Sequence, residues 1–201
     1  GKRLFTRFGP QVLEVINRKG VPIFLDLKFH DIPNTVAEAC AEAVAHKVAL
    51  INVHASGGRQ MMLKACEAIE KRAAELSVPK PKLIAVTVLT SLDDEAIKEI
   101  GYSDRVEGQV RRLALLAKDC GLDGVVAAPG EARLIREACG PGFLIVTPGI
   151  RPTAVEGDDQ KRVVTPKMAM EMGSDYIVVG RPVIKAPDPV AVAKNIAAEM
   201  A

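Results

Sequence analysis

The chain has 201 residues, which suits one domain, or at most two small ones, with a sizeable core. Its 27 basic and 25 acidic residues leave a net charge of only +2, and aromatic residues make up 3% with no Trp. These values argue against a nucleic-acid surface, an anionic-membrane surface or a base-stacking platform as the main function.

The chain has no apolar run near 18 residues, so we expect no membrane-spanning helix. The four cysteines lie far apart, at 40, 66, 120 and 139, and form no CxxC or zinc-knuckle spacing. They are interpreted as reduced thiols of a cytoplasmic protein.

Short, nearly all-apolar segments alternate with longer amphipathic ones, which is typical of parallel strands covered on both faces by helices. We expect strands at 21–25, 49–54, 82–88, 124–127, 143–147 and 176–179. We expect helices at 10–19, 35–46, 59–76, 93–100, 105–120, 130–138, 166–172 and 189–200.

This alternation predicts a parallel α/β fold, either an open doubly wound sheet or a (β/α)8 barrel. The sequence contains neither GxGxxG nor GxxxxGK[ST], which weakens dinucleotide-binding and P-loop interpretations. A barrel needs eight strands and six are expected here. The chain also begins at Gly1 rather than Met. A barrel interpretation therefore implies a single domain over 1–201 that lacks its first two strands.

The densest group of charges lies in LDLKFHDIPNT, residues 25–35, at the end of the first expected strand. Asp26 and Lys28 are two residues apart, so in a strand they share a face. Asp31 follows in the loop, and Pro33 then begins a helix. Charges at the end of an apolar strand are costly unless they pair or do chemistry. Catalysis at a barrel mouth is the favoured interpretation, and a salt bridge that closes the mouth is the alternative.

Polar groups also end the second and third expected strands. His54 could be a general base or a ligand, although a hydrogen-bonded supporting role is favoured. Gly57 and Gly58 allow a tight turn or a close approach to a ligand. Thr90 and Ser91 could bind a polar ligand with their hydroxyls, or one of them could cap the helix at 93–100.

Arginine and glycine residues follow the last two expected strands. Arg151 ends the segment TPGIR, Gln160 lies in the long polar loop after it, and Gly180 and Arg181 follow the last strand. If the first two barrel strands are missing, these loops follow strands seven and eight, where barrels commonly bind phosphate. The pattern therefore predicts a phosphate site built from guanidinium and backbone N–H groups.

The motifs LDLKFHDIPNTV, NVHASGG, VTVLTS, TPGIR, GDDQKR and VVGRPV occur in this order and resemble the bacterial orotidine 5'-phosphate decarboxylase family nearly end to end. The resemblance implies a homodimeric (β/α)8 barrel without metal or organic cofactor. It also implies conversion of orotidine 5'-monophosphate to uridine 5'-monophosphate and CO2, the last step of de novo synthesis of that nucleotide.

The resemblance further implies roles for individual residues. Asp26 would sit beside the substrate carboxylate, and Lys28 would stabilise and protonate C6. Asp31 would reach the partner subunit's site. The expected substrate contacts are Ile32, Thr35, Thr90, Ser91, Pro148, Arg151, Gln160, Gly180 and Arg181. Among them, Arg151, Gln160, Gly180 and Arg181 would hold the phosphate.

The family's charged array has two Asp and two Lys, and its first Asp and first Lys would both fall before Gly1. We therefore expect the sequence to be an incomplete record of a longer protein, because every later motif is intact. Two alternatives remain open. One is a Mg²⁺-dependent sugar-phosphate decarboxylase or aldolase that shares D-x-K-x-x-D, and the other is a non-catalytic nucleotide-phosphate binder.

Overall fold

The computed structural model describes residues 1–152 and 164–200. In this part of the chain, six strands form one sheet in the order β1-β2-β3-β4-β5-β6, which is also their order along the sequence. The paired strands β1–β2, β2–β3 and β5–β6 are parallel, as the alternating pattern predicts. Contacts divide the chain into two compact units, 1–87 with 112–125 and 88–111 with 126–201.

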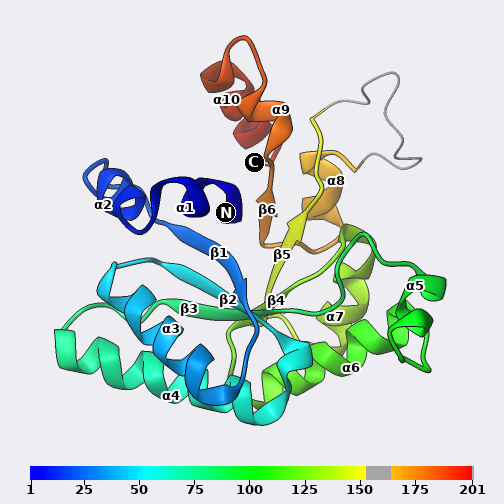
Figure 1. Cartoon of the computed structure of the whole chain (residues 1–201). Coiled ribbons are helices and arrows are strands. Elements are labelled where there is room, and N and C mark those ends of the chain that lie inside the picture. The colour runs from blue at the N-terminus through cyan, green and yellow to red at the C-terminus, as the bar shows by residue number, and fades with distance from the viewer. Residues whose placement is uncertain (153–163, 201) are drawn as a thin grey trace. The chain divides into compact units, whose positions relative to one another are not determined.

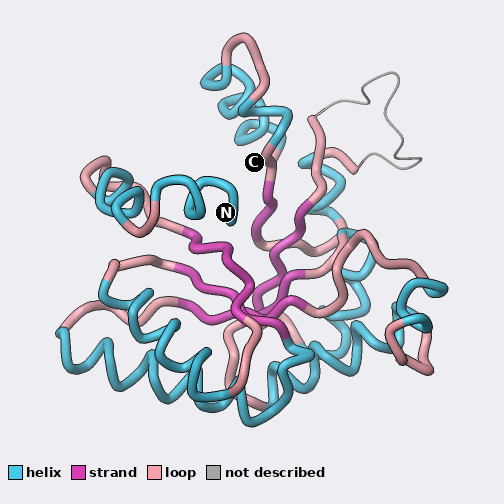
Figure 2. Tube along the Cα trace, in the orientation of Figure 1, coloured by secondary structure: helices cyan, strands magenta, loops and turns pink. Residues whose placement is uncertain are grey.

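The first unit contains β1 to β3 with their helices (Figures 1 and 2). Its elements are α1 (Lys2–Phe8), α2 (Gln11–Asn17), β1 (Phe24–Phe29), α3 (Pro33–Ala45), β2 (Leu50–His54), the 3-10 turn η1 (Ala55–Gly57), α4 (Gly58–Leu76) and β3 (Lys82–Val86). Helix α6 (Val106–Asp119) and strand β4 (Gly124–Val126) each have residues in both units.

Helices α3 and α4 pack side by side against the first strands because each carries one apolar stripe (Figure 1). The buried residues of α3 are Val36, Cys40, Ala43 and Val44, and those of α4 are Met61, Met62, Ala65, Ile69 and Ala73. On β2, Ile51 and Val53 are completely buried. Most residues of β2 and β3 are therefore apolar, because helices cover these strands.

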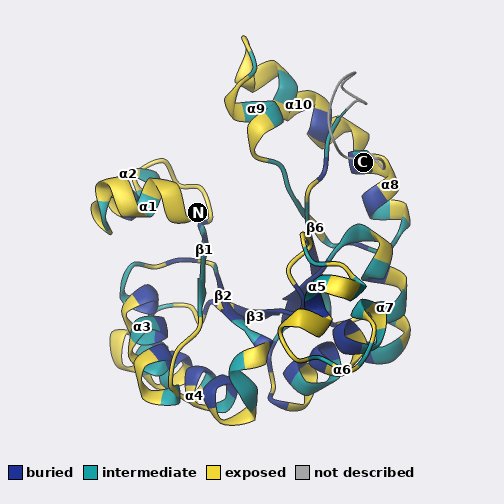
Figure 3. Cartoon of the chain, turned by 45° about the vertical axis from the view of Figure 1, so that its right-hand side comes forward, coloured by how far each residue is buried: buried dark blue, intermediate teal, exposed yellow. Residues whose placement is uncertain are grey.

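Helices α1 and α2 contribute little to this core (Figure 3). Helix α1 has no buried residue, and α2 buries only Leu13. The sequence predicted a helix at 10–19 but none over Lys2–Phe8. It also missed the single turn α9 (Arg181–Ile184), which likewise buries no residue. Both omissions have the same cause, since hydrophobic periodicity detects helices through the face they bury.

The first strand is a correction to the sequence prediction. It was expected at 21–25 and lies at Phe24–Phe29, so Asp26 and Lys28 are inside the strand rather than after it. The prediction ended the strand at its first charged residue. The backbone continues because the two charges neutralise each other and find a polar partner on the next strand, as the site geometry below explains.

The second unit contains β5 and β6 with the helices that follow them. Its elements are α5 (Asp94–Glu99), the 3-10 turn η2 (Pro129–Glu131), α7 (Ala132–Cys139), β5 (Leu144–Pro148), α8 (Pro166–Glu171), β6 (Tyr176–Val178), α9 and α10 (Pro189–Glu199). The two strands pair in register from Val146 with Tyr176 to Pro148 with Val178. Their ends therefore lie level, and the loops that follow them start at the same edge of the sheet.

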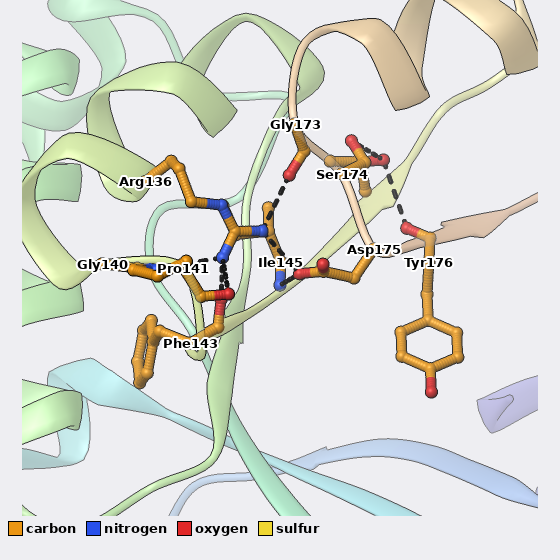
Figure 4. Close-up of polar contacts among 10 residues, drawn as sticks. Arg136, Gly140, Pro141, Phe143, Ile145, Gly173, Ser174, Asp175 and Tyr176 are labelled. Carbon is orange, nitrogen blue, oxygen red and sulfur yellow. Dashed lines mark hydrogen bonds and ion pairs between the residues drawn. The ribbon is translucent and has the colours of Figure 1, made fainter.

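Arg136 on α7 ties together the chain segments that lead into β5 and β6 (Figure 4). Its guanidinium donates to the carbonyl oxygens of Gly140, Pro141, Phe143 and Gly173 and lies 2.7 Å from Asp175 Oδ2. The same carboxylate oxygen accepts the Ile145 N–H at 2.7 Å. One half-buried arginine thus satisfies several carbonyls and fixes the starts of both strands.

All four cysteines are free, and Cys40, Cys120 and Cys139 are buried. Burial raises the pKa of Cys40 to about 12 and that of Cys66 to about 11, so both thiols are protonated at neutral pH. Over 1–152 and 164–200, none of the helices combines the length and apolar character that a bilayer crossing requires.

Arg136→Ala should lower the free energy of unfolding by about 2–4 kcal/mol, because it leaves a half-buried carboxylate and several carbonyls without their donor. The matched control is Arg133→Ala, on the same helix. Arg133 pairs with Glu137 at 3.1 Å, but its side chain is 87% exposed. That variant should lose less than about 0.5 kcal/mol. Urea unfolding of both variants measures the difference, and equal losses would show that Arg136 does not anchor these strands.

Candidate active site

The backbone of β1 is irregular where its charged residues lie. Leu25 pairs with Ile51 on β2 and Phe29 pairs with Val53, so residues 26–28 of β1 face a single β2 residue. Lys28 has a φ of +56°, in the left-handed region. Such a bulge changes the direction of side chains, and left-handed backbone at a non-glycine residue costs about 1–2 kcal/mol. Residues 26–28 therefore depart from regular strand geometry, and the contacts described next hold them in this conformation.

Asp26 and Lys28 form an ion pair inside this bulge. Lys28 Nζ lies 2.5 Å from Asp26 Oδ1, and each side chain is 25% exposed. The sequence predicted that the two residues share a face by strand alternation, and the structure brings them together. Alternation is not the reason, however, because the register is broken between Leu25 and Phe29.

Asn52 on β2 is the single residue opposite the bulge, and it is completely buried. Its Oδ1 accepts the Lys28 backbone N–H at 2.8 Å, and its Nδ2 donates to Asp26 Oδ1 at 2.6 Å. The amide therefore replaces the ladder hydrogen bonds that the bulge interrupts. The sequence interpretation gave Asn52 no role, although an amide between Ile51 and Val53 in an apolar strand was a usable signal.

The electrostatic surroundings keep Asp26 ionised. Burial raises the pKa of its carboxyl, but hydrogen bonds from Lys28 and Asn52, together with the Lys28 charge, outweigh burial and lower it below the ordinary value. At neutral pH the site therefore holds one fixed carboxylate in contact with one ammonium group. Such a pair can present a positive charge to an anionic reaction centre and can repel a second carboxylate.

Two histidine rings lie close to each other near Lys28, with their planes tilted by 32°. His30, just after β1, and His54, at the end of β2, have ring centroids 5.1 Å apart. Burial lowers the pKa of His54 to about 4, and the nearby His30, Lys2 and Lys28 act in the same direction. His54 is therefore neutral at pH 7, which agrees with the supporting role favoured from the sequence and leaves a neutral ring beside the charged pair.

The glycine pair after β2 is needed for packing and for the turn. A Cβ on Gly57 would lie 2.1 Å from Met61 Sδ, and Gly58 has a φ of +85°. Gly57 leaves room for the methionine at the start of α4, and Gly58 supplies a conformation that other residues rarely adopt.

The other candidates of the first unit lie around the start of α3. Asp31 Oδ1 accepts the N–H of its neighbour Ile32 at 2.7 Å. Ile32 is the N-cap residue of α3 and is 66% exposed, and Thr35 is exposed on the first turn. No hydrogen bond or ion pair between described residues joins Asp31 to the Asp26–Lys28 pair. The Asp31 side chain is exposed in the described part of the chain.

The second unit carries the candidates expected at the substrate. Thr90 and Ser91 are exposed in a turn closed by the Leu92 N–H on the Leu89 carbonyl at 2.9 Å. The expectation that one of them could cap the next helix is wrong. Asp93 is the cap of α5, because its carboxylate accepts the N–H groups of residues 95 and 96. Neither the Thr90 nor the Ser91 hydroxyl therefore caps this helix.

The phosphate candidates follow the level ends of β5 and β6. Pro148 is the last residue of β5, and Gly149 turns the chain with a φ of +83° before Arg151. The Arg151 N–H donates to the Val164 carbonyl at 3.1 Å. On the neighbouring strand end, Gly180 and Arg181 are exposed at the start of α9. Gln160 and most of the polar loop lie outside the described residues.

Within the described residues, no three His, Cys, Asp or Glu side chains cluster in a way that would hold a metal ion. The candidate site of the first unit therefore consists of an Asp–Lys ion pair, a buried amide and two histidine rings. Acid–base and electrostatic chemistry is what these groups can supply.

A parallel β/α sheet with a charged pair on one strand and polar loops after the others has the features of an enzyme of the (β/α)-barrel class. The family model described as orotidine 5'-phosphate decarboxylase / HUMPS family matches residues 1–196. The chain belongs to this family, as the sequence motifs predicted.

Several relatives are similar over the whole chain. The orotidine 5'-phosphate decarboxylase of Moorella thermoacetica is 54% identical over 201 residues, which are 100% of this chain and 80% of the relative. That of Syntrophotalea carbinolica is 55% identical and covers 100% of this chain and 82% of its own length.

A solved structure supports the fold. The crystal structure of orotidine 5'-phosphate decarboxylase from Lactobacillus acidophilus matches with a TM-score of 0.83 at 40% identity, over 96% of this chain and 81% of that chain. The predicted barrel class is confirmed, with six strands in the described residues.

The low pKa of His54 predicts how stability depends on pH. The pKa is about 4 in the folded protein and about 6.5 in the unfolded chain, so between these values the unfolded state binds more protons. The free energy of unfolding should therefore fall as the pH is lowered from 6.5 to 4, by at most about 3 kcal/mol from this residue. In the His54→Gln variant, this part of the fall in the free energy of unfolding should be absent.

Urea unfolding at several pH values gives the free energy of unfolding of the parent and of the variant. The contribution of His54 is the difference between the slopes of these two free energies against pH. NMR titration of the His54 ring gives an independent value. Equal pH slopes, or a ring that titrates near 6.5, would contradict the burial effect.

Proposed function

We propose that the protein decarboxylates orotidine 5'-monophosphate to uridine 5'-monophosphate and CO2, the last step of de novo synthesis of this nucleotide. The observation that carries the proposal is the Asp26–Lys28 pair, 2.5 Å apart on β1 in a chain of this family. Relatives named for this activity are 54% and 55% identical over the full chain.

The reaction needs a stabilised carbanion. The bond between C6 and the carboxylate carbon breaks, CO2 leaves, and the electron pair remains on C6. The Lys28 ammonium stabilises this charge and then transfers a proton to C6, and the amine regains a proton from water. A fixed cation is most effective where the charge develops, because it needs no reorganisation during the reaction.

Asp26 has two parts in this mechanism. Its carboxylate holds the ammonium group through one oxygen, and its negative charge lies next to the leaving carboxylate of the substrate. Because its pKa is lowered, it stays ionised at neutral pH. A charged neighbour of this kind disfavours the bound carboxylate more than the neutral CO2 that it becomes.

The remaining candidates would bind the rest of the substrate. In this proposal the pyrimidine and ribose are held by Ile32, Thr35, Thr90 and Ser91, and the phosphate is held by Pro148, Arg151, Gln160, Gly180 and Arg181. The level ends of β5 and β6 support a shared phosphate site for their two loops. Binding energy from a remote phosphate can then be used at the reacting carbon.

The proposal includes a homodimer of single-domain barrels in which Asp31 of each subunit completes the other subunit's site. Among the described residues, no hydrogen bond or ion pair joins Asp31 to Asp26 or Lys28 of its own chain, which supports this arrangement. We also place the enzyme in the cytoplasm, since its four cysteines are free thiols.

Lys28→Ala should lower kcat by about 10³-fold or more, because the cation at the reacting carbon is lost. Binding of the product, uridine 5'-monophosphate, should change much less. The matched control is Lys82→Ala, since Lys82 also pairs with an aspartate, Asp123, at 2.8 Å but sits at the start of β3. The measurement is a spectrophotometric assay with a chelator present.

Full activity of Lys28→Ala would remove Lys28 from the mechanism. Loss of parental activity on adding the chelator would favour the magnesium-dependent sugar-phosphate enzymes instead. Tight product binding by a parent without turnover would favour a nucleotide-phosphate binder.

Mixing the inactive variants Lys28→Ala and Asp31→Ala should restore activity if Asp31 acts across a dimer interface. One of the two sites in each mixed dimer then has both residues. Random exchange should give about one quarter of the parental activity. The assay is repeated after subunits are unfolded and refolded together. An inactive mixture in which mixed dimers are detected would argue against a shared site.

A further inference from the structure

The bulge in β1 faces one polar side chain of β2. Residues 26–28 face Asn52 alone, and the Lys28 N–H, which a regular ladder would pair with a backbone carbonyl, is instead bound by Asn52 Oδ1 at 2.8 Å. Lys28 at this point has a φ of +56°. A left-handed lysine persists only where its surroundings determine it, and Asn52 is the polar contact that meets its backbone.

The same amide also controls the carboxylate. Asn52 Nδ2 and Lys28 Nζ donate to one oxygen, Asp26 Oδ1, at 2.6 and 2.5 Å. The contacts close a ring from the Lys28 backbone through Asn52 and Asp26 to the Lys28 ammonium. Because Asn52 is completely buried, water does not replace either hydrogen bond.

We propose that Asn52 is a positioning residue for the decarboxylation proposed above. One hydrogen bond holds the Lys28 backbone in the left-handed conformation, and the other fixes the rotamer of Asp26. The position of the Lys28 ammonium group is therefore set both by its own backbone and by the carboxylate that it contacts. The expected effect on kcat rests on the proposed function. The effect of Asn52 on the conformation of Lys28 rests only on the two hydrogen bonds of the Asn52 amide.

A purely space-filling role does not account for this geometry. The neighbours of Asn52 on β2, Ile51 and Val53, are also completely buried and are apolar. A buried amide is costly in such a strand unless both of its ends are paired. Here both ends are paired, and both partners belong to the candidate catalytic residues.

Two variants separate the two hydrogen bonds. Asn52→Ala removes both. Asn52→Asp has the same size and keeps an acceptor for the Lys28 N–H. In its ionised form, which the assay reaches by raising the pH, it has no donor for Asp26 and adds a second carboxylate beside it. Thr147→Val is the matched control, since Thr147 is completely buried on β5, where its hydroxyl bonds to Ser174 at 2.9 Å.

The readouts are kcat and KM for orotidine 5'-monophosphate, together with NMR of the Lys28 backbone. The Cα and Cβ shifts and the HN–Hα coupling of Lys28 report whether its φ is positive. Asn52→Ala should lose about 100-fold in kcat with KM within about threefold, because small displacements of a catalytic group are costly while the phosphate contacts remain. Its Lys28 signals should leave the left-handed range.

Asn52→Asp should keep the left-handed signals of Lys28 and, at a pH where its new carboxyl is ionised, lose kcat to a similar extent. Thr147→Val should keep kcat within about threefold and leave the Lys28 signals unchanged. If Asn52→Ala does not fold, Asn52→Asp tests the proposal by itself through this combination of a retained conformation and a lost kcat.

The proposal is overturned if Asn52→Ala keeps kcat within threefold, if Asn52→Asp does so at a pH where its new carboxyl is ionised, if Thr147→Val loses as much, or if Lys28 stays left-handed in Asn52→Ala. A parent that does not decarboxylate the substrate would refute the proposed function instead. In that case the NMR signals still decide whether Asn52 sets the conformation of Lys28.

Discussion

The structure of the first unit depends on keeping two charges inside a strand of an otherwise apolar sheet. Asp26 and Lys28 neutralise each other at 2.5 Å, and this pairing offsets the desolvation that strand β1 imposes on both. The bulge opposite Asn52 and the left-handed backbone of Lys28 both accommodate that pair. A fixed ammonium group is the result, and such a group is what a developing carbanion requires.

Much of the fold could be predicted because the apolar segments have the lengths of buried strands and the helices bury regular stripes. The helices α3 and α4 were found close to their observed bounds for this reason. Helix α1 was missed because it buries nothing, and the first strand was ended too early because Asp26 looked like a boundary. Periodicity detects what packs, so it fails where an element is exposed or where charges are internal.

The candidate site was predictable in composition and less so in geometry. The D-x-K-x-x-D motif identified the residues, and the structure brings Asp26 and Lys28 together. Asn52 was overlooked because its role depends on a broken register between β1 and β2, which no spacing within either strand encodes. The cap of α5 was predicted wrongly for a different reason, because Thr90, Ser91 and Asp93 are all residue types that cap helices and Asp93 is the one that does so.

The anchoring of β5 and β6 has a consequence for how new specificity could evolve. Arg136 and Asp175 fix these strands where they begin, whereas Arg151 and Arg181 follow the opposite ends. Substitutions or insertions in the loops after the strands leave the anchor untouched. A descendant could therefore acquire loops for a different phosphorylated compound while it retains the stability of its scaffold.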